Sequence, residues 1–211
     1  LGISILAADA WQSDPDAAFA LSAELHLVLD SLGRQAAADE IYALLAVHAS
    51  SVLGLVAPAC IQIASLTNRT RYEDAIALGC RLLAPLDMAP PLDDLPQAVE
   101  EELERFYAHV QEGALERLPD SPALEDSQRL AAAKLMSRMA SAALFSQPML
   151  MHWIVLRIVR LWIEDGFHAI ALRPAGALIS LTIMHRGDFA TGYHLARVAL
   201  ATGLARECGV E

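Results

Sequence analysis

The sequence predicts an all-α protein built from antiparallel helix hairpins. Residues 71–76 read RYEDAI and residues 187–193 read GDFATGY, and each segment follows an apolar stretch of helical length. In both segments an aromatic residue is followed three places later by a small residue. The composition agrees, because the chain is 55% hydrophobic but only 6% aromatic, and much of its apolar content is alanine, the best helix former.

The first four helices follow from local signals. Asp14 and Pro15 predict a helix start, because an acidic N-cap and a proline at the first helical position are favoured there. This helix is expected to run to residue 32, where Gly33 ends it. Apolar residues at the helical period predict a second helix over residues 35–51. Gly54 and Pro58 interrupt the pattern, so a third helix is expected only over residues 58–67, and a fourth over residues 71–86.

The middle of the chain is expected to separate two groups of hairpins. Pro90 and Pro91 cannot lie inside a helix, and they divide hairpins in residues 1–88 from a proline-containing linker with an acidic helix in residues 89–126. Further hairpins in residues 127–211 are expected to pack on the same array. Their helices, and the acidic one, are expected over residues 96–113, 127–145, 148–165, 169–185 and 188–207, for a total of about nine or ten helices and no strand.

The hairpins align with one another. An offset of 37 residues places Ala38 on Ala75, and an offset of 117 places Ala75 on Gly192. A small residue at this point lets the second helix lie close against the first, as in tetratricopeptide-type repeats. The sequence therefore predicts a right-handed superhelical array of hairpins, a tetratricopeptide-like α-α superhelix.

The charge of the chain argues against a nucleic-acid partner. The formal net charge is −11 and Lys134 is the single lysine, whereas phosphate backbones are bound by clustered Lys and Arg. An acidic run contains Glu100, Glu101, Glu102 and Glu104, and such runs are usually solvated helix faces.

No catalytic, cofactor-binding or metal-binding residue is predicted. The three cysteines, Cys60, Cys80 and Cys208, are far apart and odd in number, which favours neither disulfides nor zinc. The histidines lack metal-ligand spacing, and the sequence has no phosphate-binding glycine loop, nucleophile elbow or kinase motif. The chain is therefore not expected to be an enzyme.

Membrane insertion is not expected. The apolar stretches at residues 150–163 and 169–184 are interrupted by Arg157, Arg160 and Arg173, whereas a spanning helix needs about 20 largely apolar residues. The chain begins at Leu1 with no initiator Met and no signal segment, so we expect an internal piece of a longer cytoplasmic protein.

Four ordered motifs resemble one family: LGRQAAADEIYALL at 32–45, NRTRYEDAIALGCRLLAPLDM at 68–88, SQPMLMHWIVLRIVRLWIEDG at 146–166 and HRGDFATGYHLARVAL at 185–200. Over nearly its whole length the chain is similar to the helical region of large bacterial signalling proteins, in which a signal-transduction ATPase is followed by such helices and then by sensor and output modules. The resemblance implies no catalytic residue in this region. It implies contacts with neighbouring domains or with other proteins.

Three functions can be compared at this point. The leading hypothesis is a non-catalytic scaffold that contacts a protein partner or a neighbouring domain. The contacts would be made by the concave surface, which is lined by the first helix of each hairpin, with Tyr42, Tyr72 and Tyr193 as candidate contact residues. The alternative is a helical module that binds a small effector in an apolar pocket beside Trp153 and Trp162. A stand-alone helical enzyme would need converging acids or histidines, and no such set is visible.

Overall fold

The chain is all-helical in the part that the structure, a computed structural model, describes, which is residues 10–206. No strand occurs in this range, and the sole β-type pairing within it is an isolated bridge between Ala123 and Phe167. The α-helices are α1 (Ala10–Ser13), α2 (Pro15–Ser31), α3 (Gln35–His48), α4 (Val52–Asn68), α5 (Tyr72–Leu83), α6 (Leu95–Gln111), α7 (Ala114–Arg117), α8 (Ser127–Ser146), α9 (Pro148–Asp165), α10 (Leu172–Arg186) and α11 (Phe189–Ala205). Short 3-10 helices are η2 (Ala84–Leu86), η3 (Leu92–Asp94), η4 (Leu118–Asp120) and η5 (Ala169–Ala171).

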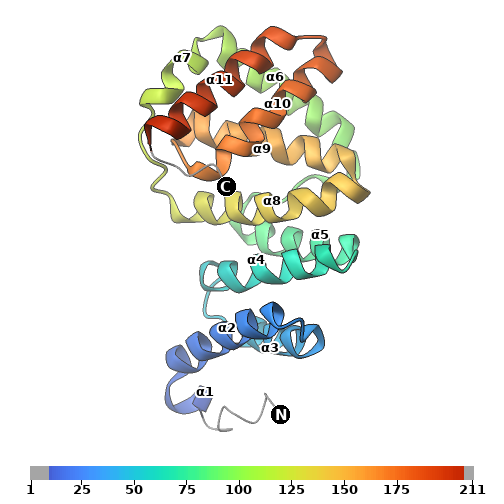
Figure 1. The fold of residues 1–211 in the computed structure, drawn as a ribbon, viewed down its shortest axis with the longest axis vertical. Coiled ribbons are helices and arrows are strands. Elements are labelled where there is room, and N and C mark those ends of the chain that lie inside the picture. The colour runs from blue at the N-terminus through green and yellow to red at the C-terminus, as the bar shows by residue number, and fades with distance from the viewer. Residues whose placement is uncertain (1–9, 207–211) are drawn as a thin grey trace.

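Consecutive helices pair and then stack along the long axis of the molecule (Figure 1). The pairs are α2 with α3, α4 with α5, α8 with α9, and α10 with α11. Helix α8 packs on both α4 and α5, and α10 packs on α9, so the pairs follow one another. Helix α6 lies outside this order, because it packs on α9, which comes later in the chain. The acidic helix is therefore attached to the C-terminal pairs and not to α5.

Local signals set the helix ends as expected. The Asp14 carboxylate accepts a hydrogen bond from the Ala17 backbone N–H at 3.0 Å, and so caps α2. At the turns within hairpins the backbone takes a positive φ at aligned positions: Gly33 (69°), Thr70 (59°) and Gly187 (64°). Glycine adopts this conformation without steric cost, whereas a β-branched residue does not. The same turn is thus built three times, once with an unfavourable residue.

The small residues aligned within the hairpins are buried, and one of them lies at a close approach of two paired helices. Ala38 and Ala75 are buried, and Gly192 is buried against α10. A Cβ atom at Gly192 would lie 2.5 Å from the Ile179 Cα atom and would also meet the Thr182 hydroxyl. Backbone, and not a flexible side chain, therefore limits the size of this residue.

The expected start of the third helix is wrong. Helix α4 begins at Val52, six residues before Pro58, because the Ser51 hydroxyl caps it by accepting a hydrogen bond from the Gly54 N–H at 3.2 Å. Proline inside a helix removes one backbone hydrogen bond, here the one to the carbonyl four residues earlier. That carbonyl belongs to Gly54, which is exposed to solvent, while Pro58 itself is buried in the helix interface.

The core is thickest around α8 and α9. Alanines and methionines of α8 face large side chains of α9, and Trp162 is fully buried there. Gly79 allows α5 to pack closely against α8, since a Cβ atom at that position would overlap the Met139 side chain. Within residues 10–206, no helix combines the length and the apolar character that crossing a membrane requires.

Candidate functional site

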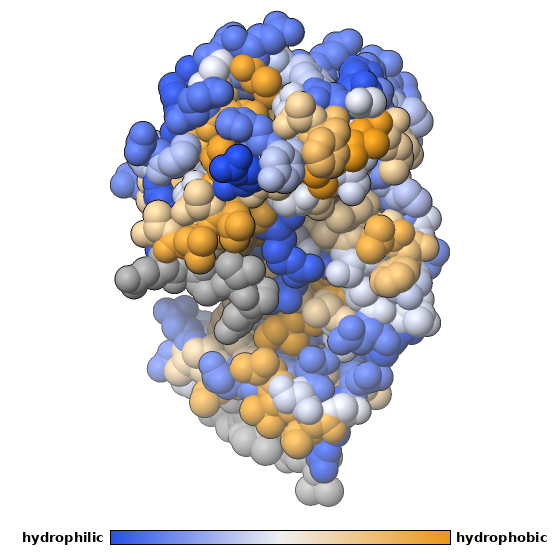
Figure 2. All heavy atoms as spheres, turned by 45° about the horizontal axis from the view of Figure 1, so that its top comes forward, coloured by the Kyte–Doolittle hydropathy of each residue, from blue (hydrophilic) through white to orange (hydrophobic). Residues whose placement is uncertain are grey.

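A hollow of about 790 Å³ opens between α2, α4, α8 and α10. These four are the first helices of their pairs. We call it the cationic hollow, and its lining residues are Leu27, Asp30, Leu53, Val56, Ala57, Cys60, Ile61, Ala64, Lys134, Ser137, Arg138, Ile170 and Arg173. Figure 2 shows a face of the molecule that is recessed at mid-height, where strongly hydrophilic atoms lie between apolar patches.

One side of the cationic hollow is apolar because of helical spacing. The residues that α4 contributes occupy positions 53, 56, 57, 60, 61 and 64, and steps of three and four place side chains on one face of a helix. Leu53 is 40% exposed. Burial raises the pKa of the Cys60 thiol, and the charges of Arg138 and Lys134 oppose this shift. Cys60 therefore belongs to the apolar side and carries no negative charge at neutral pH.

The other side of the hollow is positively charged. Lys134 and Arg138 are four residues apart on α8, which places them on one face of that helix, and Arg173 is the second residue of α10. All three side chains are exposed. In the described part of the chain none of them belongs to an ion pair. Asp30, on the α2 side, is the acid among the lining residues.

A narrower apolar slot of about 150 Å³ adjoins the cationic hollow between α8, α9 and α10. The two spaces share Ser137 and Arg173. The slot is lined by Ser137, Ala140, Ser141, Leu144, Met151, Ile154, Val155, Ile158, Arg173, Pro174 and Ala177. It is therefore an apolar recess with one guanidinium among its lining groups, large enough for a single aliphatic side chain or a small organic group.

The three tyrosines predicted as contact residues lie elsewhere. Tyr42, Tyr72 and Tyr193 belong to α3, α5 and α11, the second helices of their pairs, and none lines the cationic hollow. Tyr42 is only 9% exposed, and burial raises its pKa to about 12. Tyr72 stacks on Phe145, whereas Tyr193, 49% exposed, stacks on Phe189. The structure does not bring the three together into one surface.

The two tryptophans considered for an effector pocket are core residues. Trp162 is fully buried, its indole N–H donates a hydrogen bond to the Ser121 hydroxyl at 3.0 Å, and its ring meets Phe167 edge to face. Trp153 is also buried and lines a separate, polar hollow beside Arg157. Neither tryptophan lines the apolar slot, which uses another face of α9.

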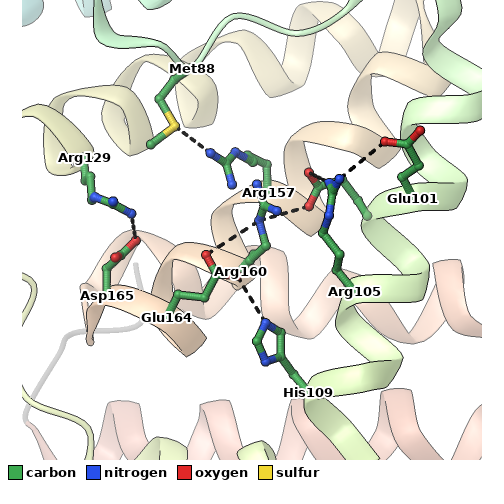
Figure 3. A network of polar contacts seen from close by, with 10 residues as sticks. Met88, Glu101, Arg105, His109, Arg129, Arg157, Arg160, Glu164 and Asp165 are labelled. Atoms are coloured by element: carbon green, nitrogen blue, oxygen red, sulfur yellow. Dashed lines mark hydrogen bonds and ion pairs between the residues drawn. The ribbon is translucent and has the colours of Figure 1, made fainter.

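Polar side chains between α6 and α9 form a network (Figure 3). Glu102 accepts a hydrogen bond from Arg105 at 3.1 Å, and its other oxygen lies 3.2 Å from the Arg160 Nε atom. Arg160 also approaches Glu164 at 3.9 Å, and Glu164 contacts His109 at 3.2 Å. Nearby, Arg129 pairs with Asp165, and an Arg157 guanidinium N–H points at the Met88 sulfur at 3.0 Å.

This network corrects the expectation of a solvated acidic face at one residue, since Glu102 is buried whereas Glu101 and Glu104 are exposed as expected. Glu102 is only 4% exposed, and burial raises its pKa despite the neighbouring arginines. Its partner Arg160 lies 58 positions away in the chain, so the pairing has no local sequence signal. The network attaches α6 to α9 through pairs of opposite charge.

The described residues contain no group of three or more His, Cys, Asp or Glu side chains placed to hold a metal ion. No protein-family profile matches the chain, and neither the curated proteins nor the solved structures include a match.

Proposed function

We propose that this chain is a non-catalytic scaffold of tetratricopeptide-like helix hairpins in a cytoplasmic bacterial signalling protein. It would mediate contacts with a partner protein, or between an ATPase module and an output module. One observation carries the proposal: the cationic hollow is lined by α2, α4, α8 and η5–α10, so the first helices of successive pairs contribute to one recessed surface. Repeat arrays use this inner surface for binding.

Two further observations support the repeat interpretation. The aligned small residues Ala38, Ala75 and Gly192 are all buried, and the turns that precede them share a positive φ. The resemblance of four ordered motifs to the helical regions of ATPase-linked signalling proteins favours the signalling role.

Site-specific photo-crosslinking tests the proposal. A photoreactive phenylalanine at Leu53 reports on the cationic hollow, and the same residue at Val47 of α3, which is 78% exposed, is the matched control. In lysate of the source organism we expect a discrete crosslinked protein or domain from position 53 but not from position 47. Equal labelling at both positions, or none at 53, would contradict this placement of the site.

A third position tests the sequence-based candidates. Tyr193 is exposed on α11, so a crosslinker there reports on the second helices. Crosslinking from position 193 alone would keep the scaffold function but transfer the contact surface away from the cationic hollow.

The apolar slot supports a second candidate function, a small-molecule effector module. Apolar recesses with a few polar groups are typical ligand sites, and Arg173 supplies one such group. Ala177 is exposed at the slot, so Ala177→Phe is expected to obstruct it without disturbing the core. A small apolar acid that raises the melting temperature of the wild type, but not of this variant, would favour the effector function.

A further inference from the structure

The positive charges of the cationic hollow stand out in an acidic protein. Lys and Arg number 15 against 26 Asp and Glu. Six arginines elsewhere in the described residues are paired with carboxylates, as Arg69 is with Asp39 and Arg186 with Glu100. Lys134, Arg138 and Arg173 line one space, and the described residues provide no carboxylate partner for them.

Like charges in one recess have an electrostatic consequence. Two cations at i and i+4 on a helix repel each other and lower helix stability slightly. A recess lined by one sign of charge, with apolar walls of low polarisability, concentrates the field and attracts the opposite charge. The hollow is therefore suited to a negatively charged occupant.

The occupant must also be apolar. Opposite the cations lies the stripe of α4 that contains Leu53, Val56 and Ile61, and the apolar slot opens beside Arg173. A simple inorganic anion would leave these surfaces uncovered. An amphipathic helix satisfies both conditions, since it presents acidic and apolar side chains on adjacent faces and binds by laying its apolar face in a groove.

We infer that the cationic hollow binds an acidic amphipathic helix of a partner protein, with carboxylates on Lys134, Arg138 and Arg173 and one apolar side chain in the slot. This inference rests on the proposed scaffold function and adds the chemistry of the partner. Asp30 on the α2 side repels acidic groups and so fixes which way the acidic face points.

Fluorescence anisotropy with a designed probe tests the inference. The probe is a labelled synthetic helical peptide with Glu and Leu on adjacent faces, and its matched controls replace every Glu by Lys or every Leu by Gln. The acidic amphipathic peptide is expected to bind saturably and less tightly as salt is raised. Both control peptides are expected to bind at least tenfold more weakly.

Variants of the chain locate the binding. Lys134→Glu combined with Arg138→Glu is expected to weaken peptide binding by roughly tenfold or more, because two attractions become repulsions. Asp30→Asn is expected to tighten binding, since it removes a repulsion. Arg197→Glu on α11 is the control for a charge reversal outside the hollow, because Arg197 is exposed and does not line the hollow. Circular dichroism should be unchanged in all of them.

Two results would overturn the inference. One is equal binding of the Glu and Lys peptides. The other is acidic-peptide binding that the double charge reversal and Arg197→Glu reduce equally. If no peptide binds while the crosslinker at position 53 still captures a partner, the partner chemistry is wrong but the scaffold function stands. If position 53 captures nothing either, both fail.

Discussion

The close approach of α10 and α11 should make the stability of the protein depend on Gly192. Gly192→Ala adds a Cβ atom that would lie 2.5 Å from the Ile179 Cα atom, well inside van der Waals contact. Because the obstacle is backbone, the two helices must separate. Overpacking of this kind costs up to about 3 kcal/mol, whereas replacing glycine by alanine inside a helix contributes about 1 kcal/mol. We expect a net destabilisation of about 2 kcal/mol.

The same substitution at Gly176 is a matched control. Gly176 lies in α10, is exposed, and has no atom within 4 Å of an added Cβ. Gly176→Ala should therefore stabilise the protein by about 1 kcal/mol through helix propensity alone. Urea denaturation followed by circular dichroism would measure both. If Gly192→Ala is as stable as Gly176→Ala, close helix packing does not require the small residue.

Three further predictions concern the turns, the buried ion pairs and pH. Thr70→Gly should stabilise the protein by about 1 kcal/mol, because it removes a β-branched residue at φ 59°; Thr67→Gly, inside α4, should destabilise it in the same urea assay. Arg160→Leu alone should lower the free energy of unfolding by about 3 kcal/mol, because Glu102 stays buried with one partner fewer. Adding Glu102→Leu should restore most of that loss in a double-mutant cycle, whereas additive losses would contradict the coupling. Burial lowers the pKa of His168 to about 4. As the pH falls from about 6.5, this histidine is therefore protonated in the unfolded chain before it is protonated in the folded protein. The free energy of unfolding should decrease by about 1.4 kcal/mol per pH unit down to about pH 4. Unfolding midpoints at several pH values should show a smaller decrease for His168→Phe, and an unchanged pH dependence would contradict the assignment to His168.

Features set by neighbouring residues could be predicted from the sequence. The cap at Asp14, the turn at Gly33 and the small residues at Ala38, Ala75 and Gly192 each follow from short patterns with a direct steric or hydrogen-bonding cause. The pairing of consecutive helices follows because short turns leave few alternatives. The all-helical fold could be predicted, and is confirmed, because helix formation depends on such local patterns.

Features set by distant residues could not be predicted. The acidic run has the composition of a solvated face, and its member Glu102 is buried only because α9 returns beside α6. The cationic hollow combines α4, α8 and α10, which no local pattern connects. Its apolar stripe does have a sequence signal at positions 53 to 64. Gly54 and Pro58 interrupt the helical pattern there, so the predicted helix begins only at residue 58 and does not include the first part of the stripe.

The contact of α6 with α9 also affects how the molecule would respond to force. In a simple array each pair touches only its neighbours, so pairs can detach one at a time from either end. The hairpin of α2 and α3 can leave in this way, but α9 is held by both α8 and the earlier α6, and α11 also packs on α7 and η4. When the chain is stretched between its ends, we expect the N-terminal hairpin to extend first. The segment from α6 to α11 should then rupture as one unit, because the Glu102–Arg160 and Glu100–Arg186 pairs join α6 to α9 and α10.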